Sequence, residues 1–287
     1  MGTILTSERL ARTTDSGAGA GELTVEFVAG KSAATHAQAR SPLKILVPRS
    51  RGQSVWAYLS NFGGGLLPGD EIDFSMRVGN AARCFLGTQS STKIFKCGPK
   101  GAVKNHFMAE VGADALLVFA ADVAQGFAES RYRQRQSIRL ADESSSLVFL
   151  DWYCAGRSAR GERWSFSEYA TRSEIHLGER LIFLDSVRLN SDDELLALGE
   201  RFGRVNCVAT LVLLGPLMEA NVLESLKRVA ASGVAKRADT LEVASAISGG
   251  AVFRFAGISV ESVARLIRSR IDFISDLLGD NPFERKW

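Results

Sequence analysis

The sequence has few cysteines, histidines and prolines and no long apolar run, and each shortage argues against a class of protein. No CxxC pair occurs, so a disulfide framework or structural zinc site is not expected, and the thiols are predicted to be reduced, as in a cytosolic protein. The longest mainly apolar stretch, residues 207–218, is too short for a bilayer span, which needs about 20 residues. The first twelve residues lack the apolar segment of a signal peptide. We therefore expect a cytoplasmic protein without a membrane anchor. The four cysteines are Cys84, Cys97, Cys154 and Cys207.

The motifs of common enzyme classes are also missing. There is no GxSxG, HExxH or GxxxxGK[ST] sequence. The three histidines (His36, His106 and His176) lie far apart and share no partner nearby in the sequence, so nothing supports a histidine-based metal centre or triad. The 35 basic and 32 acidic side chains give a net charge of +3, and a dedicated nucleic-acid binder is usually far more basic.

The composition of the 287-residue chain is that of an ordered globular protein, with 46% hydrophobic and 23% charged residues. Three parts are predicted, which together form one compact domain. Residues 1–22 form a flexible leader, residues 23–190 a β-rich body, and residues 191–287 an α+β part packed on that body.

Short runs with strand-like alternation dominate the body. Residues 147–150 are instead continuously apolar, which predicts a strand covered on both faces. Eleven strands without intervening amphipathic helices favour stacked sheets, a barrel or a solenoid. The predicted strands are Leu23–Ala29, Leu43–Val47, Val55–Tyr58, Glu71–Val78, Arg83–Gly87, Val103–Val111, Ala115–Phe119, Glu129–Leu140, Leu147–Ala155, Phe166–Leu177 and Arg180–Arg188.

The last hundred residues predict a β-α-β-β-α arrangement with two helices, preceded by weak helical spacing over 192–202. Pro216 begins the first main helix, residues 217–231. Ser259 is the expected N-cap of the second, which Gly279 ends. The strands of this part are predicted at Val208–Leu214, Thr240–Ile247 and Ala251–Gly257.

Three segments are unusually dense in functional residue types. Residues 63–96 contain three consecutive glycines, which indicate a backbone conformation that other residues would resist or simply a tight corner between strands. Residues 151–164 contain two tryptophans, three arginines and two carboxylates, which fit either a partner surface or an internal arginine–carboxylate cluster. Four arginines between 131 and 139 share one parity, so they lie on one face of a strand, which is solvated or contacts an acidic partner.

Five segments stand out by their motifs and by their order and spacing: GGGLLPGD at 63–70, TQSSTKIFK at 88–96, SRYRQRQ at 130–136, LVFLDWYCAGRSARGERW at 147–164 and LIFLDSVRL at 181–189. Together they resemble the UreD family of urease accessory proteins, called UreH in some bacteria. The DWxxxGRxxxGExW pattern of the fourth segment looks more like the eukaryotic branch of the family than the common bacterial one.

The resemblance implies a largely β fold of stacked, solenoid-like sheets with two helices. It also implies a protein that is not an enzyme. Members of the family act as scaffolds that join UreF and the GTPase UreG, contact apo-urease, and pass nickel(II) through an internal tunnel. No cofactor is then bound permanently and no metal is held tightly, because a conduit needs weak sites in series.

The resemblance also assigns candidate residues. The acids that match its motifs, Asp70, Asp122 and Glu162, are candidates for the nickel tunnel or its mouth, and each could equally cap a turn or pair with an arginine. Residues that match the family motifs or could contact a partner are Thr88, Gln89, Thr92, Lys93, Asp151, Trp152, Gly156, Arg157, Gly161 and Trp164.

Two alternatives remain open. A hydrolase could use the carboxylate–arginine cluster from Asp151 to Glu162, since paired carboxylates perform acid–base catalysis at a suitable separation. An interaction module unrelated to metal is the other. The chain also departs from the family pattern in two places. Pro68 stands where many relatives have a small residue, and around Asp122, where eukaryotic relatives tend to carry prolines, this chain has none.

Overall fold

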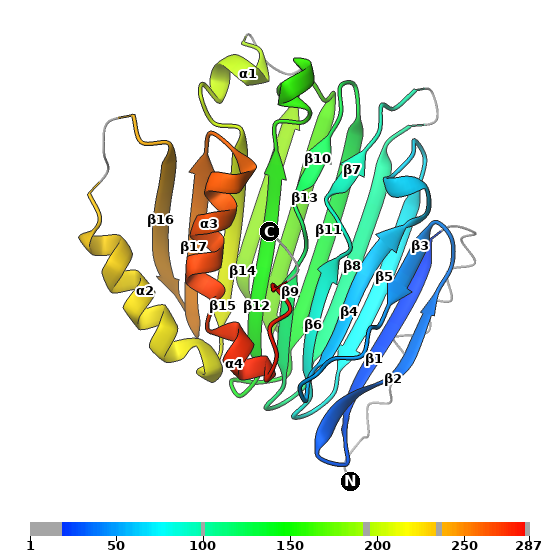
Figure 1. The fold of residues 1–287 in the computed structure, drawn as a ribbon, viewed down its shortest axis with the longest axis vertical. Coiled ribbons are helices and arrows are strands. Elements are labelled where there is room, and N and C mark those ends of the chain that lie inside the picture. Colours follow the sequence, from blue (N-terminus) through cyan, green and yellow to red (C-terminus); the bar gives the residue numbers. More distant parts are fainter. Residues whose placement is uncertain (1–18, 99–100, 192–195, 234–236, 285–287) are drawn as a thin grey trace.

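A computed structural model describes residues 19–98, 101–191, 196–233 and 237–284, which form two stacked β-sheets with helices on one outer face (Figure 1). The smaller sheet contains, in spatial order, β14 (Arg180–Asn190), β13 (Glu168–Leu177), β11 (Arg131–Leu140), β8 (Val103–Val111), β5 (Glu71–Val78), β1 (Ala20–Val28) and β2 (Lys31–Ala39). The main path of the larger sheet is β16 (Thr240–Ile247), β17 (Gly250–Gly257), β15 (Cys207–Leu214), β12 (Ser146–Cys154), β9 (Leu116–Ala120), β6 (Arg83–Thr88), β4 (Val55–Asn61) and β3 (Leu43–Leu46).

Successive strands of the body alternate between the two sheets. From β4 to β13 the longer strands fall in the larger and the smaller sheet in turn, and within each sheet they pair in parallel. The short strands β7 (Thr92–Ile94) and β10 (Ala124–Gly126) follow β6 and β9 and also belong to the larger sheet. Each turn of this coil takes about thirty residues; Glu71 and Lys104, for example, are register partners 33 residues apart. The predicted solenoid-like stacking of a mainly β protein is therefore confirmed. It is built without a sequence repeat, because only the alternation of apolar residues recurs.

The strand β12 lies between two apolar layers. On one side, Phe149 packs in the core between the sheets, and on the other side Val148 and Leu150 pack beneath the helices. The continuous apolar run at residues 147–150 was predicted to be covered on both faces, and it is. Asp151 interrupts this run of buried residues.

The C-terminal part extends the larger sheet and covers its outer face. Strands β15, β17 and β16 pair antiparallel beyond β12, and the last three helices of the chain lie across the outer face of that sheet (Figure 1). Ser259 caps α3 through its side chain, and Gly279 ends α4 in a left-handed conformation, both as predicted. The helices are α1 (Leu198–Arg201), α2 (Glu219–Ala231), α3 (Val260–Ile271) and α4 (Ile274–Leu278), with 3-10 turns at Phe62–Gly64, Ser158–Arg160 and Pro216–Met218.

Several elements differ from the prediction. The last helix is broken, since α3 ends at Ile271 and α4 begins at Ile274. Of the weak helix predicted over residues 192–202, only α1 is present, and residues 192–195 lie outside the described residues. Three strands were not predicted: β2, β7 (Thr92–Ile94) and β10 (Ala124–Gly126). Most of the predicted leader also lies outside the described residues, but β1 already begins at Ala20.

Within the described ranges, none of the helices combines the length and the apolar character that crossing a bilayer requires. All four cysteines fall in these ranges and are free thiols. Burial raises the pKa of the Cys84 thiol to about 12, so this cysteine is an unreactive core residue.

Candidate functional site

A band of polar side chains crosses the otherwise apolar space between the two sheets. We call it the polar track. Its members come from the inward faces of seven strands, from β8 in the middle of the smaller sheet to β17 near the edge of the larger one. They are Asn105, Tyr132, Gln134, Gln136, Asp151, Ser173, Asp185, Thr210 and Arg254.

Strand register explains how residues distant in sequence meet in this track. In the smaller sheet, Gln136 faces Ser173 on β13, and Ser173 faces Asp185 on β14. In the larger sheet, Asp151 on β12 is aligned with Thr210 on β15, which is aligned with Arg254 on β17. Because side chains alternate along a strand, these aligned residues point to the same face and form two facing polar rows.

Hydrogen bonds connect the first half of the track. Asn105 Nδ2 lies 2.9 Å from Tyr132 Oη, and that hydroxyl donates to Gln134 Oε1 at 2.6 Å. The amides of Gln134 and Gln136 then donate to the two oxygens of Asp151, at 3.4 and 3.2 Å. The Asp151 carboxylate is therefore held by two neutral donors and by no cation among the described residues.

The second half of the track ends in an ion pair. Asp185 accepts from Thr210 Oγ1 at 3.2 Å and from Arg254 Nη2 at 3.0 Å. Half of the Arg254 side chain is exposed, whereas Asp185 is 18% exposed, so this end of the track reaches solvent. The track thus runs from a neutral amide end to a solvent-facing charged end.

Asp151 has the most perturbed carboxyl group of the track. Its pKa is raised to about 7, mainly because burial removes the carboxyl group from water and secondarily because of the negative charge of Asp185. The hydrogen bonds from Gln134 and Gln136 act in the opposite direction and lower the pKa. Its side chain nevertheless keeps some accessible surface. Near neutral pH this carboxyl group can exchange a proton or bind a cation. Carboxyl groups with strongly perturbed pKa values are concentrated at functional sites.

A cavity of about 390 Å³ opens beside the first residue of the track. Asn105 lines it, together with residues of the glycine corner and of the TQxxTK block. Gly64 has φ of +74°, which an L-side chain would resist, so the corner needs glycine there. The cavity therefore joins the motif at residues 63–70 to the polar track through Asn105.

The three predicted tunnel acids are not members of the polar track. Asp70 caps its own turn, since its Oδ2 accepts from the Leu67 N–H at 2.8 Å. Asp122 is bonded to Thr88, whose hydroxyl lies 3.0 Å from Asp122 Oδ2. Glu162 accepts hydrogen bonds from Arg157 and from the Ala128 N–H. Both lower the pKa of its carboxyl group, and the hydrogen bond from Arg157 has the larger effect. Their place in a nickel path stays a prediction.

Asp122 faces a second cavity, of about 540 Å³, on the helix side of the larger sheet. Gln89, Trp152 and the α3 residues Glu261, Arg265 and Arg268 also line it. The TQxxTK block thus lies between the two cavities: Gln89 borders both, whereas Thr88 and Thr92 line the first. The carbonyl of Lys93, on β7, accepts a hydrogen bond from the N–H of Leu66 in the glycine corner at 2.8 Å.

The segment from Asp151 to Trp164 folds back on itself rather than presenting its aromatic groups to solvent. Trp152 is 2% exposed and donates to the Ala121 carbonyl, and Trp164 is 3% exposed and stacks on Phe202 with ring centroids 4.0 Å apart. Gly156, at φ +95°, lies against the Gly126 carbonyl, where a Cβ would collide. The cluster also includes Arg157, whose guanidinium lies 4.0 Å from the Phe127 ring, and Gly161, which ends the 3-10 turn.

Asp151 and Glu162 do not form a catalytic pair. Asp151 bonds to β11 amides between the sheets, whereas Glu162 is bonded to Arg157 and Ala128, so the two acids share no partner among the described residues. A general acid needs a raised pKa, but that of Glu162 is lowered. The geometry gives no support to the hydrolase alternative.

Of the residues in the polar track, only Asp151 was predicted as a candidate from the sequence; the glutamines Gln134 and Gln136 and the second acid, Asp185, are among those that were not. A signal for the two glutamines was present, because they alternate with the arginines of 131–139 and occupy the inward parity between Tyr132 and Ile138. The arginines lie on the outer face as expected, where Arg133 pairs with Glu168 and Arg139 with Glu179. Two polar residues on a core-facing parity are the mark of an internal polar site.

Comparison with known proteins identifies the family. The model of the family described as UreD urease accessory protein matches residues 18–287. A protein named urease accessory protein UreD from Sorangium cellulosum is 45% identical over 271 residues, covering 94% of this chain and 85% of its own. A second bacterial relative of that name, from Anaeromyxobacter, is 39% identical, with 93% of this chain and 89% of its own covered. Urease accessory protein D of Oryza sativa subsp. indica is 30% identical, with 93% and 95% covered. The chain therefore belongs to the UreD family of urease accessory proteins.

Proposed function

We propose that this protein is a non-catalytic scaffold of urease maturation. Together with UreF and the GTPase UreG it binds apo-urease and helps to deliver nickel(II) to the urease active site. The ion passes between the two sheets along the polar track, and it is cargo rather than a resident cofactor. The observation that carries this proposal is the polar track itself, because an interior built only for stability has no need of it.

The ligands offered by the track suit transit rather than storage. Nickel(II) prefers imidazole, whereas carboxylate, amide and hydroxyl oxygens bind it more weakly. The track offers oxygens, with Asp151 as the central carboxylate and Asp185 beyond it. A path needs such weak sites in series, since a tight site would trap the ion.

Proton balance adds to this argument. Because the pKa of Asp151 is raised to about 7, an arriving cation displaces a proton from part of the population. The charge of the occupied site then changes by less than the full charge of the ion. Such a carboxyl group is neutral enough to persist between the sheets and becomes anionic when a cation arrives.

A buried hydroxyl near Asp151 supports a wet interior. Tyr169 Oη is buried and has no hydrogen-bond partner among the described residues. The pKa of this phenol is raised mainly by burial and secondarily by the negative charge of Asp151. Asp151 is therefore a near neighbour of Tyr169. Buried hydroxyl groups of this kind normally bond to ordered water, and a hydrated ion needs water along its path.

Partner binding finds support at two edge strands, β14 of the smaller sheet and β16 of the larger one. The outer strands β14 and β16 carry exposed apolar side chains: Leu181 and Leu184 on β14, and Leu241 and Val243 on β16. Exposed apolar groups on edge strands favour protein contacts. Co-purification of the tagged chain with UreF, UreG and urease should succeed, and Leu184→Glu with Val243→Glu should weaken it. Wild-type protein that captures neither UreF nor urease would contradict the scaffold role.

The nickel route is tested by co-producing urease with the maturation proteins and measuring nickel per urease active site. Asp151→Asn removes a carboxylate without changing its shape, and we expect nickel loading to fall about tenfold or more while partner binding persists. The matched control is Glu143→Gln, which removes an exposed carboxylate just before β12 and should leave loading unchanged. Unchanged loading with Asp151→Asn and retained partner binding would favour a metal-independent interaction module.

A further inference from the structure

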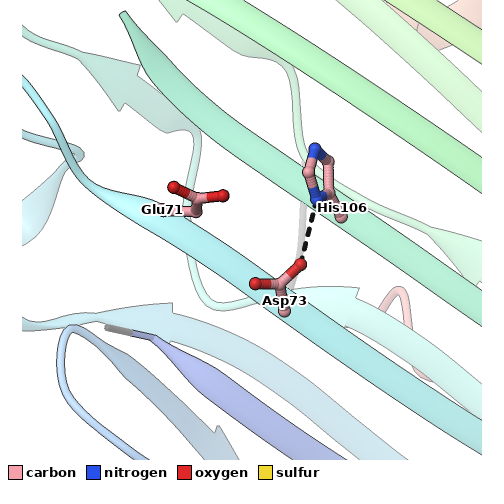
Figure 2. A group of neighbouring side chains, drawn as sticks. All are labelled: Glu71, Asp73 and His106. Carbon is pink, nitrogen blue, oxygen red and sulfur yellow. Dashed lines mark hydrogen bonds and ion pairs between the residues drawn. The ribbon is translucent and has the colours of Figure 1, made fainter. Parts of the chain in front are cut away.

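Outside the polar track, three metal-ligating side chains meet on the outer face of the smaller sheet. Glu71 and Asp73 lie on β5, two residues apart, and His106 lies on the neighbouring strand β8 (Figure 2). One ligand atom from each side chain lies within 4.8 Å of the others. We propose that this cluster binds one first-row divalent transition-metal ion, such as Ni²⁺, Zn²⁺, Co²⁺ or Cu²⁺.

The two strands hold the cluster on a rigid platform. Asp73 and His106 are direct register partners in a parallel pair at the middle of the seven-stranded sheet. Ile72 and Phe74, which alternate with the two acids, are buried between the sheets and fix the strand that carries them. Sites built on strands with a packed reverse face keep their geometry better than sites on loops.

The spacing suits a metal ion with little rearrangement. His106 Nδ1 lies 2.9 Å from Asp73 Oδ1 (Figure 2). With metal–ligand bonds of about 2.0–2.2 Å, two adjacent ligands of an octahedral ion lie about 3 Å apart, so this pair already has that separation. Glu71 reaches the third position by rotating its partly exposed side chain.

The donor set also points to the class of ion. One imidazole nitrogen favours Ni²⁺, Cu²⁺ or Zn²⁺ over Mg²⁺ and Ca²⁺, which prefer oxygen ligands alone. Three protein ligands leave positions for water, because Asp73 and His106 keep about a third of their surface exposed. The site is therefore of the exchangeable kind.

Nearby cations oppose binding and limit its strength. Lys104 Nζ lies 3.3 Å from Glu71 Oε2, and Arg135 on β11 is the register partner of His106. The Lys104–Glu71 pair is exposed, and exposed pairs contribute little free energy, so an arriving divalent ion can displace the lysine. Removal of the Lys104 charge should then strengthen metal binding.

The same sheet offers a matched control. His36 on β2 lies 3.6 Å from Glu22 on β1, which gives one imidazole and a single carboxylate. If one histidine and one carboxylate were enough to bind the ion, the Glu22–His36 pair would bind it as well as the Glu71–Asp73–His106 cluster does. Our proposal requires the three-ligand cluster to bind and the two-ligand pair to bind much more weakly.

Nickel titration of the purified full-length chain by calorimetry tests the site. His106→Gln and Asp73→Asn should each remove one binding event or weaken it about tenfold or more, whereas His36→Gln should change nothing. Lys104→Met should tighten the same event several-fold. In proton NMR of the wild-type protein, Ni²⁺ should broaden the His106 imidazole signals before those of His36 and His176, a readout that needs no variant.

Equal binding by wild type and His106→Gln would overturn the proposal, as would a wild-type chain that binds no Ni²⁺ at millimolar concentration. Loss of binding with Asp151→Asn alone would place the ion in the polar track instead. The inference does not rest on the proposed delivery role, because it is measured on the isolated chain without urease.

Discussion

Two interiors of this molecule contrast sharply, although the same larger sheet borders both. Beneath the helices, its outer face packs against α2, α3 and α4 in a cluster of apolar residues such as Phe253, Val263 and Ile267. Its inner face, toward the smaller sheet, combines an apolar core with the polar track around Asp151. Apart from the buried ion pair between Arg270 and Glu242, the helix layer has the composition of a layer built for stability. The layer between the sheets has polar groups that stability alone does not require, and we place the function there.

The largest expected effect of a single substitution on stability lies in the helix layer. Ile267 on α3 is fully buried there, so Ile267→Ala should lower the free energy of unfolding by about 2–5 kcal/mol. Urea denaturation measures this loss. Because the residue is remote from the polar track, the folded variant should still load urease with nickel. Normal stability together with lost nickel loading would reverse the roles that we give to the two layers.

The next effect reverses the usual sign of a core substitution. The folded-state pKa of Asp151, about 7, lies above its ordinary value of 3.8, so the folded protein binds this proton more tightly than the unfolded chain. The contribution of Asp151 to stability is therefore complete below about pH 4 and is lost as pH rises through 7.

Asp151→Asn removes this loss. From pH 5 to pH 7.5, the stability of the variant relative to wild type should rise by about 2–3 kcal/mol, because this range spans about two pKa units below the folded-state pKa and one unit corresponds to about 1.4 kcal/mol. Urea denaturation at the two pH values tests the sign. If the difference in stability between wild type and Asp151→Asn did not change with pH, Asp151 would be ionised throughout this range, like an ordinary surface carboxylate.

A smaller effect is expected at the start of α3. The Ser259 side chain accepts from the Ser262 N–H at 3.1 Å, and loss of an N-cap costs about 1 kcal/mol. Ser259→Ala should lower stability by that amount without changing nickel loading. Ser259→Asp, which can still cap the helix, is the control and should restore stability.

The smallest effect lies on the outer face of the smaller sheet. Arg133 makes a two-pronged ion pair with Glu168, but the arginine is 59% exposed. Arg133→Met should therefore change the free energy of unfolding by less than about 1 kcal/mol. Salt titration of wild type should give a similarly small change, and a loss of several kcal/mol would show that this face is not simply solvated.

The predicted fold and the observed fold agree where one face of a strand is buried. Strands such as Glu71–Val78 alternate clearly and were predicted with the correct bounds. Strand β2 was missed because its residues are small or polar and mostly exposed, so its sequence shows no alternation. Strands β7 and β10 have three residues each, too few for a periodic pattern.

The polar track could not be predicted in the same way, because its contacts are non-local. Asp151 was grouped with Arg157 and Glu162, its neighbours in sequence, but in space it meets Gln134 and Gln136. Those contacts depend on how the parallel coils stack, which is set by register between strands far apart in the chain. Local periodicity indicates which residues point inward, but not which of them face each other.

The proposed function requires nickel(II) to pass between the two sheets along the polar track. Diffraction at the nickel absorption edge, from crystals of the full chain soaked in millimolar Ni²⁺, tests it most directly. We predict an anomalous peak between the sheets beside Asp151, within bonding distance of its carboxylate, and its loss in Asp151→Asn. Peaks confined to the outer faces, including the Glu71–Asp73–His106 cluster, with none between the sheets, would contradict the claim.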